Sequence, residues 1–192
     1  MKVSIIIPCY NSEDYIEQSL LSALNQSYEK VNVICVDNES TDNSLEVIKN
    51  VQKKFNNLIV SEAPNLYEYS WEEPVAEAMK FCDSDYFTIL ASDDYLEKDY
   101  VEKNIEIIKK SNGKIKVMQS PLRGFSNLKD QFFPNYIKHS YKNLNEFKEL
   151  LFKKCPVTTP TVFYKKELYD NNMINWNSKW IVTGKQQLFK LI

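Results

Sequence analysis

Apolar and polar positions follow one another along the chain in blocks that predict strands and helices in turn. Continuous apolar runs, which are typical of strands buried on both faces of a sheet, occupy residues 3–7, 31–36, 58–60, 86–90, 115–118 and 161–164. Between and after them, apolar residues at helical spacing predict helices over 16–26, 45–55, 74–81, 101–108 and 144–151, with a last one starting at 188–192. This alternation predicts an α/β fold, in which helices flank a mostly parallel sheet.

The stretch 120–140 breaks this pattern. Pro121, Gly124 and Pro134 occur there among aromatic residues, which is typical of a long functional loop or an irregular insertion. We find no internal repeat, linker or low-complexity tract, and 192 residues suit one domain. We therefore expect a single domain over residues 1–192.

Charge and hydropathy argue against a nucleic-acid-binding protein and against a transmembrane protein. The formal net charge is −2, and lysines and arginines are spread along the chain, whereas a nucleic-acid-binding protein normally carries a basic stripe. No segment reaches the roughly 18 to 20 apolar residues that span a bilayer, and the run after Met1 is too short for a signal peptide. We expect a cytoplasmic protein without a transmembrane segment; peripheral contact with the inner face of the membrane stays open.

The positions of the cysteines argue against disulfides and a metal site, and those of the glycines exclude the common glycine-rich nucleotide-binding motifs. The four cysteines lie far apart, which favours small buried hydrophobes over disulfides or a metal site; they are Cys9, Cys35, Cys82 and Cys155. The three glycines form neither a dinucleotide fingerprint nor a P-loop. A nucleotide would therefore bind here without a glycine-rich phosphate cradle.

Polar and aromatic residues follow three of the predicted strands, at residues 8–11, 37–40 and 92–94. In parallel sheets, ligands bind beyond the carboxyl ends of the strands. Tyr10 offers a flat surface for a base, and Asp37 or Asn38 offers an acceptor for a base N–H. The pair Asp93–Asp94 offers carboxylates for a divalent cation that bridges phosphates.

Each of these features has a purely structural alternative. Tyr10 can cover the sheet edge, Asp37 with residues 40–42 can be turn and helix-cap chemistry, and Asp93–Asp94 can be a capped turn. Their convergence on one edge of one sheet favours a binding site. A phospho-receiver domain is disfavoured, because its acidic pair follows the first strand, where this chain has Pro-Cys-Tyr-Asn.

Three motifs resemble the family 2 inverting glycosyltransferases. Residues 3–11 read VSIIIPCYN, similar to the family opening V-S-I-I-I-P-x-Y-N. Residues 36–42 read VDNESTD, which resembles V-D-D-G-S-T-D, and residues 85–96 read DYFTILASDDYL, which resembles G-D-Y-I-x-x-L-D-x-D-D. Their order and spacing fit across roughly residues 1 to 118.

The resemblance implies a GT-A fold, with a Rossmann-like nucleotide-sugar-binding part over 1–118 and a short acceptor-side part over 119–192. It implies an enzyme that transfers a sugar from a nucleotide-diphosphate sugar, commonly a UDP-sugar, to a glycan, lipid-linked or other acceptor with inversion, using Mg²⁺ or Mn²⁺. Asp93 and Asp94 then fall at the metal-binding D-x-D motif. The nucleotide-binding residues implied are Pro8, Tyr10, Asn11, Asp37, Asn38, Ser92 and Asp93.

Several positions depart from the family pattern. Ala91 stands where the family often has the first Asp of D-x-D, Asn38 replaces the second Asp of the earlier pair, and Glu39 replaces the turn glycine. An Asn38 amide oxygen still accepts from a uracil N–H, and its NH2 is a donor. The Arg-Asn pair before the third motif has no counterpart in residues 72–76.

The acceptor side departs furthest. Residues 183–189, where the family carries an acidic pair with the general base, contain no carboxylate. Asp170 is the nearest substitute for the catalytic base, and the chain ends at Ile192, where the last helix begins. We therefore expect a shortened or degenerate member that transfers sugar slowly; the alternative is a weak or inactive nucleotide-sugar-binding module.

Overall fold

The computed structural model describes residues 1–66, 71–120, 122–126, 129–133, 162–172 and 174. A six-stranded sheet in the order β3-β2-β1-β4-β8-β5 forms its centre. The strands are β1 (Val3–Cys9), β2 (Val31–Asp37), β3 (Leu58–Glu62), β4 (Tyr86–Ile89), β5 (Val117–Gln119) and β8 (Val162–Lys165). The helices are α1 (Ile16–Leu24), α2 (Ser44–Gln52), α3 (Glu72–Met79), α4 (Tyr100–Lys110) and α6 (Glu167–Asp170).

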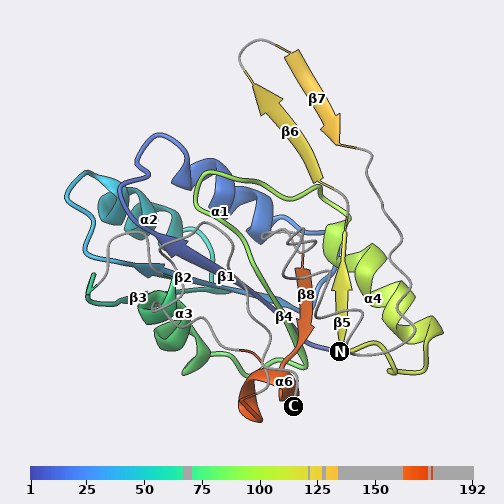
Figure 1. The fold of residues 1–192 in the computed structure, drawn as a ribbon. Coiled ribbons are helices and arrows are strands. Elements are labelled where there is room, and N and C mark those ends of the chain that lie inside the picture. The colour runs from blue at the N-terminus through green and yellow to red at the C-terminus, as the bar shows by residue number, and fades with distance from the viewer. Residues whose placement is uncertain (67–70, 121, 127–128, 134–161, 173, 175–192) are drawn as a thin grey trace, which may run out of the picture.

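Alternate residues of β1 point to opposite faces of the sheet and build two apolar cores. Ile5 and Ile7 belong to the core that α1, α2 and α4 cover, together with residues such as Leu20, Ile48 and Ile105. Ile6 belongs to the second core, which α3 and α6 cover. The sheet is thus sandwiched between helices on both faces (Figure 1), so the strands read as continuous apolar runs.

The four N-terminal strands pair in parallel, as the sequence predicts: β1 lies between β2 and β4, and β3 pairs with β2. Their carboxyl ends therefore meet at one edge. We expected Pro8 to end the first strand, yet β1 continues to Cys9. Proline is tolerated at this position because the pairing of β1 with β4 stops at Ile6↔Ile89. Beyond that point β4 does not pair with β1, so the missing backbone N–H of Pro8 costs no hydrogen bond to β4.

The C-terminal half departs from the simple alternation. β8 is inserted between β4 and β5 and runs antiparallel to both. In the stretch expected to be irregular, β6 (Leu122–Ser126) and β7 (Lys129–Phe133) pair as a two-stranded antiparallel sheet. α6 was not predicted, and the helices expected over 144–151 and 188–192 lie outside the described residues.

None of the helices in the described ranges combines the length and apolar character that crossing a bilayer requires.

Candidate functional site

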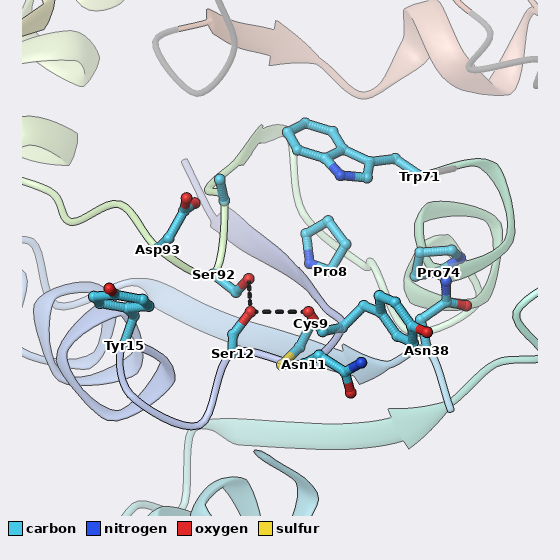
Figure 2. A pocket seen from close by; sticks show the side chains of 12 residues that line it. Pro8, Cys9, Asn11, Ser12, Tyr15, Asn38, Trp71, Pro74, Ser92 and Asp93 are labelled. Atoms are coloured by element: carbon cyan, nitrogen blue, oxygen red, sulfur yellow. Dashed lines mark hydrogen bonds between the residues drawn. The ribbon is translucent and has the colours of Figure 1, made fainter. Parts of the chain in front are cut away.

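A pocket of about 320 Å³ opens at the carboxyl ends of β1, β2 and β4. Four segments that are distant in sequence line it: the end of β1 with the loop to α1, the residue after β2, the start of α3 and the loop after β4 (Figure 2). The lining residues are Pro8, Cys9, Tyr10, Asn11, Ser12, Tyr15, Asn38, Trp71, Pro74, Ala91, Ser92 and Asp93. The structure thus brings together residues from all three sequence motifs.

Asp37 and Asn38 carry buried acceptors at this edge. Their exposed fractions are 2% and 3%. The Oδ2 atom of Asp37 accepts a hydrogen bond from the Ser40 amide at 3.0 Å, and the Asn38 amide donates to the Cys9 carbonyl at 2.8 Å. Oδ1 of each side chain has no hydrogen-bond partner among the described residues. Because a buried acceptor without a donor costs about 1 to 3 kcal/mol, and Asn38 lines the pocket, the Asn38 oxygen points to a ligand with an N–H or O–H group. Asp37 lies next to it in the chain but does not itself line the pocket.

Asn11 holds the neighbouring loop. Its side-chain carbonyl accepts from the Thr41 backbone amide at 2.8 Å and from the Thr41 hydroxyl at 3.3 Å. The backbone amide of Asn11 donates to the Ser40 hydroxyl at 3.1 Å. Asn11 has a φ of 47°, a left-handed conformation that asparagine tolerates better than most residues. It lines the pocket, but its oxygen already serves the loop, so the NH2 group is what it presents to a ligand.

The carboxylates after β4 form the candidate metal site. Asp93 is exposed and lines the pocket, whereas Asp94 is half-buried, and its amide donates to the Ala91 carbonyl at 3.1 Å in a tight turn. Burial, and next the charge of Asp93, raise the pKa of Asp94 above its ordinary value, so a cation here would offset an existing repulsion.

The donor set suits a cation that shares its coordination with a substrate. Within the described ranges no three His, Cys, Asp or Glu residues cluster as a complete metal site. Mg²⁺, however, binds through one or two carboxylates together with substrate phosphates and water. Asp93 and Asp94 fit that chemistry.

Asp170, the expected substitute for the general base, lies at the other edge of the sheet. Asp170 ends α6, the helix that follows β8. Because β8 runs antiparallel to β4, α6 lies by the amino end of β4. There the Lys166 backbone amide donates to the Asp85 carbonyl at 2.9 Å. Both Asp170 carboxylate oxygens accept from Lys166 Nζ, at 2.7 and 2.9 Å. Asp170 therefore does not line this pocket, and its role as the base stays a prediction from the sequence. Residues 183–189 lie outside the described residues.

Sequence reasoning did not assign five of the lining residues to the site: Cys9, Ser12, Tyr15, Trp71 and Pro74. Figure 2 shows the Trp71 indole on the same side of the pocket as Pro8 and across it from Tyr15. Trp71 is the N-cap residue of α3, the helix that leaves the carboxyl end of β3. That position was a usable signal, because every helix start after a parallel strand lies at this edge.

The cysteines behave as the spacing predicts. Cys9, Cys35 and Cys82 are buried and free, while Cys155 lies outside the described residues. Burial, followed by the charge of Asp37, raises the pKa of Cys9 to about 12. The thiol at the pocket floor is therefore protonated at neutral pH and acts as a small apolar group.

Comparisons with known proteins agree with this geometry. The family model described as Glycosyl transferase family 2 matches residues 4–172. The poly(ribitol-phosphate) beta-glucosyltransferase of Bacillus spizizenii is 29% identical over 194 aligned residues, which cover 100% of this chain and 29% of that protein.

Two solved structures of TarS from Staphylococcus aureus, residues 1–349, are also similar. The complex with UDP matches with a TM-score of 0.73 and 25% identity, covering 97% of this chain and 53% of that one. The complex with UDP-GlcNAc matches with a TM-score of 0.70 and 26% identity, covering 90% and 48%. The GT-A fold is thereby shown. The chain spans between 29% and 53% of the length of these relatives.

Proposed function

Because this chain belongs to glycosyl transferase family 2, we propose that it binds a UDP-sugar in this pocket and transfers the sugar, with inversion, to a glycan, lipid-linked or other acceptor. The observation that carries the proposal is the buried, unpartnered oxygen of Asn38, a residue that lines the pocket, with that of Asp37 beside it in the chain. Solved structures of TarS, similar in fold, hold UDP and UDP-GlcNAc.

Uracil fits these groups better than cytosine does. Its ring carries an N–H between two carbonyl groups, so it donates to an Asp37 or Asn38 oxygen and accepts from the Asn38 NH2 group. Cytosine has an unprotonated ring nitrogen at that position and donates only through its exocyclic amino group, which lies at a different place on the ring. The rings of Tyr10, Trp71 and Pro8 provide the flat apolar surface that a base needs.

The diphosphate would be held through Asp93. No lysine or arginine occurs among the described residues that line the pocket, so this part of the wall offers no positive side chain to the phosphates. A Mg²⁺ or Mn²⁺ ion, when bound, would neutralise charge that grows on the departing diphosphate. GT-A glycosyltransferases generally use a divalent metal; for this chain, Asp93 and Asp94 would hold it.

A second candidate is a nucleotide-sugar-binding module with weak or no turnover. Ala91 favours it, because it lines the pocket with a methyl group where the family often has a carboxylate. Asp170, the predicted substitute for the base, does not line the pocket. A positioned base contributes about 100- to 10,000-fold to such a transfer, so the two candidates differ greatly in rate.

A cytoplasmic location stays a prediction from the sequence.

Calorimetric titration with UDP, CDP and GDP in the presence of Mn²⁺ tests the binding step. We expect UDP to bind at least about tenfold more tightly than CDP, from roughly one hydrogen bond to a buried acceptor. Asn38→Ala should remove much of that preference, whereas Asn57→Ala, beyond the opposite end of β2, should leave it unchanged. Equal affinity for the three nucleotides would contradict the proposal for the base.

Release of UDP from UDP-glucose and UDP-GlcNAc, including slow hydrolysis, separates enzyme from binding module. Turnover in the ordinary range of about 1 to 1,000 per second supports the enzyme. UDP-sugar binding without turnover, tested with glycan and lipid-linked acceptors, supports the module.

A further inference from the structure

A chain of hydroxyl groups links the end of β1 to the loop after β4. Ser12 Oγ lies 3.1 Å from the Tyr10 carbonyl oxygen and 2.7 Å from Ser92 Oγ (Figure 2). A carbonyl oxygen only accepts, so the single Ser12 hydrogen goes to Tyr10. The Ser92 hydroxyl must therefore donate its own hydrogen to Ser12. What Ser92 Oγ still presents is acceptor capacity alone.

Ser12 is held from every side and does not adapt to a ligand. Its amide donates to Ser44 Oγ at 2.8 Å, and its carbonyl accepts from the amides of Tyr15 at 3.0 Å and Ile16 at 2.9 Å. Its exposed fraction is 9%. Its backbone and side chain are thus anchored to the first residue of α2, to its own loop and to the loop after β4. The direction in which Ser92 donates is set by contacts that lie behind the pocket surface.

Ser92 occupies the middle of the pocket. In Figure 2 it lies between Asp93, where the diphosphate is proposed to be held, and Pro8, on the side of the base. In a nucleoside diphosphate the ribose joins these two parts, and its 2′ and 3′ hydroxyls are donors. Ala91, the preceding residue, lines the same wall but has no polar side-chain atom.

We propose that Ser92 Oγ accepts a hydrogen bond from a ribose hydroxyl of the bound nucleotide, and that Ser12 is the positioning residue that keeps Ser92 an acceptor. The proposal rests on the proposed function, because it requires a ribonucleoside diphosphate in this pocket. It adds a specificity: the site distinguishes ribose from a sugar ring without hydroxyls, through a serine rather than through a carboxylate.

Calorimetry with UDP and 2′,3′-dideoxy-UDP in Mn²⁺ provides the test, on the unchanged protein and on Ser12→Ala, Ser92→Ala and Ser22→Ala. We expect the unchanged protein to prefer UDP by about tenfold, the range of one hydrogen bond. Ser92→Ala should lower UDP affinity by about that factor, leave dideoxy-UDP affinity unchanged and abolish the preference. Ser12→Ala should reduce the preference as well, because the Ser92 hydroxyl can then rotate, and Ser12→Thr should restore it.

Ser22→Ala is the matched control. Ser22 Oγ also donates to a carbonyl, that of Ser19, and accepts from an amide, that of Leu96, but Ser22 does not line the pocket. It should leave the ratio of the two affinities unchanged even if it lowers stability.

Three outcomes would overturn the inference. A ratio that persists in Ser92→Ala would place ribose recognition elsewhere. An equal loss of both affinities in Ser12→Ala would show a merely structural role for Ser12. A Ser92→Ala effect equal for both nucleotides, and absent with EDTA, would make Ser92 a cation ligand. If the unchanged protein binds UDP with no preference over dideoxy-UDP, this inference fails and the proposed function stands; if it binds neither, the proposed function fails with it.

Discussion

Glu13 Oε2 accepts two hydrogen bonds from Asn43, one from the backbone amide at 2.8 Å and one from Nδ2 at 2.7 Å. Asn43 is the N-cap residue of α2, but its side chain makes no capping hydrogen bond to the helix. Glu13, from the loop after β1, therefore supplies a carboxylate to the start of a helix that follows β2. Such a charge also suits the positive end of the helix dipole.

We predict that Glu13→Ala lowers the free energy of unfolding by about 1 kcal/mol, since the pair is exposed and charge-assisted hydrogen bonds at a surface contribute modestly. Urea denaturation measures it, and a double-mutant cycle with Asn43→Ala should show that the two changes are not additive. Asp14→Ala is the control, because that carboxylate has no hydrogen-bond partner in the described ranges. Full additivity of the cycle would contradict the contact.

Removal of divalent metal should weaken nucleotide binding. Asp93 lines the pocket, and none of the described lining residues is basic, so we expect a bound cation to supply the counter-charge for the diphosphate. Asp93→Ala should lower UDP affinity about 100-fold in Mn²⁺, which corresponds to a few kcal/mol. The Asp93→Ala variant should bind UDP equally well with and without EDTA. Asp99→Ala, which breaks an ion pair with Lys103 outside the pocket, should behave like the unchanged protein. An affinity that ignores both EDTA and Asp93→Ala would remove the metal from the mechanism.

Tyr10 is half-buried at the pocket wall. Tyr10→Ala should weaken UDP binding by roughly 1 to 2 kcal/mol, the range for one aromatic contact with a base, and should leave thermal unfolding cooperative. Tyr10→Phe keeps the ring and should retain most of the affinity. Loss of cooperative unfolding in Tyr10→Ala would instead assign Tyr10 to the core.

The stability of the sheet edge should depend on pH through Glu167. Its carboxylate pairs with Lys116 Nζ at 2.8 Å and Lys165 Nζ at 2.7 Å. These two lysines, Lys116 first, hold the pKa of Glu167 below its ordinary value of 4.5. A folded-state pKa below the unfolded one stabilises the protein above about pH 4.5, and that contribution is lost as pH falls through the folded value.

Unfolding measurements from pH 3 to pH 7 should therefore show a difference between the protein and Glu167→Gln that is present at neutral pH and vanishes in acid. Lys116→Gln and Lys165→Gln should each reduce that difference. A difference in the free energy of unfolding that is constant over the whole pH range would contradict the assignment of the pKa shift to the two lysines.

The sequence by itself determined the N-terminal parallel strands and the edge at which they place their chemistry. Local periodicity marks β1, β2 and β4, because strands buried on both faces must be apolar throughout. Parallel pairing then brings their carboxyl ends together, so Pro8, Asn38 and Asp93 meet in one pocket although up to 85 positions separate them.

Only the tertiary structure decided the direction of β8 and the contacts across the pocket. The pattern of 161–164 predicts a strand, but strand direction and neighbours depend on contacts with β4 and β5 that local spacing does not encode. The antiparallel insertion of β8 is what carries Asp170 to the far edge. Likewise, the hydroxyl contact between Ser12 and Ser92 joins residues 80 positions apart, and which hydroxyl donates follows from a third group, the Tyr10 carbonyl, that becomes a partner only when the chain is folded.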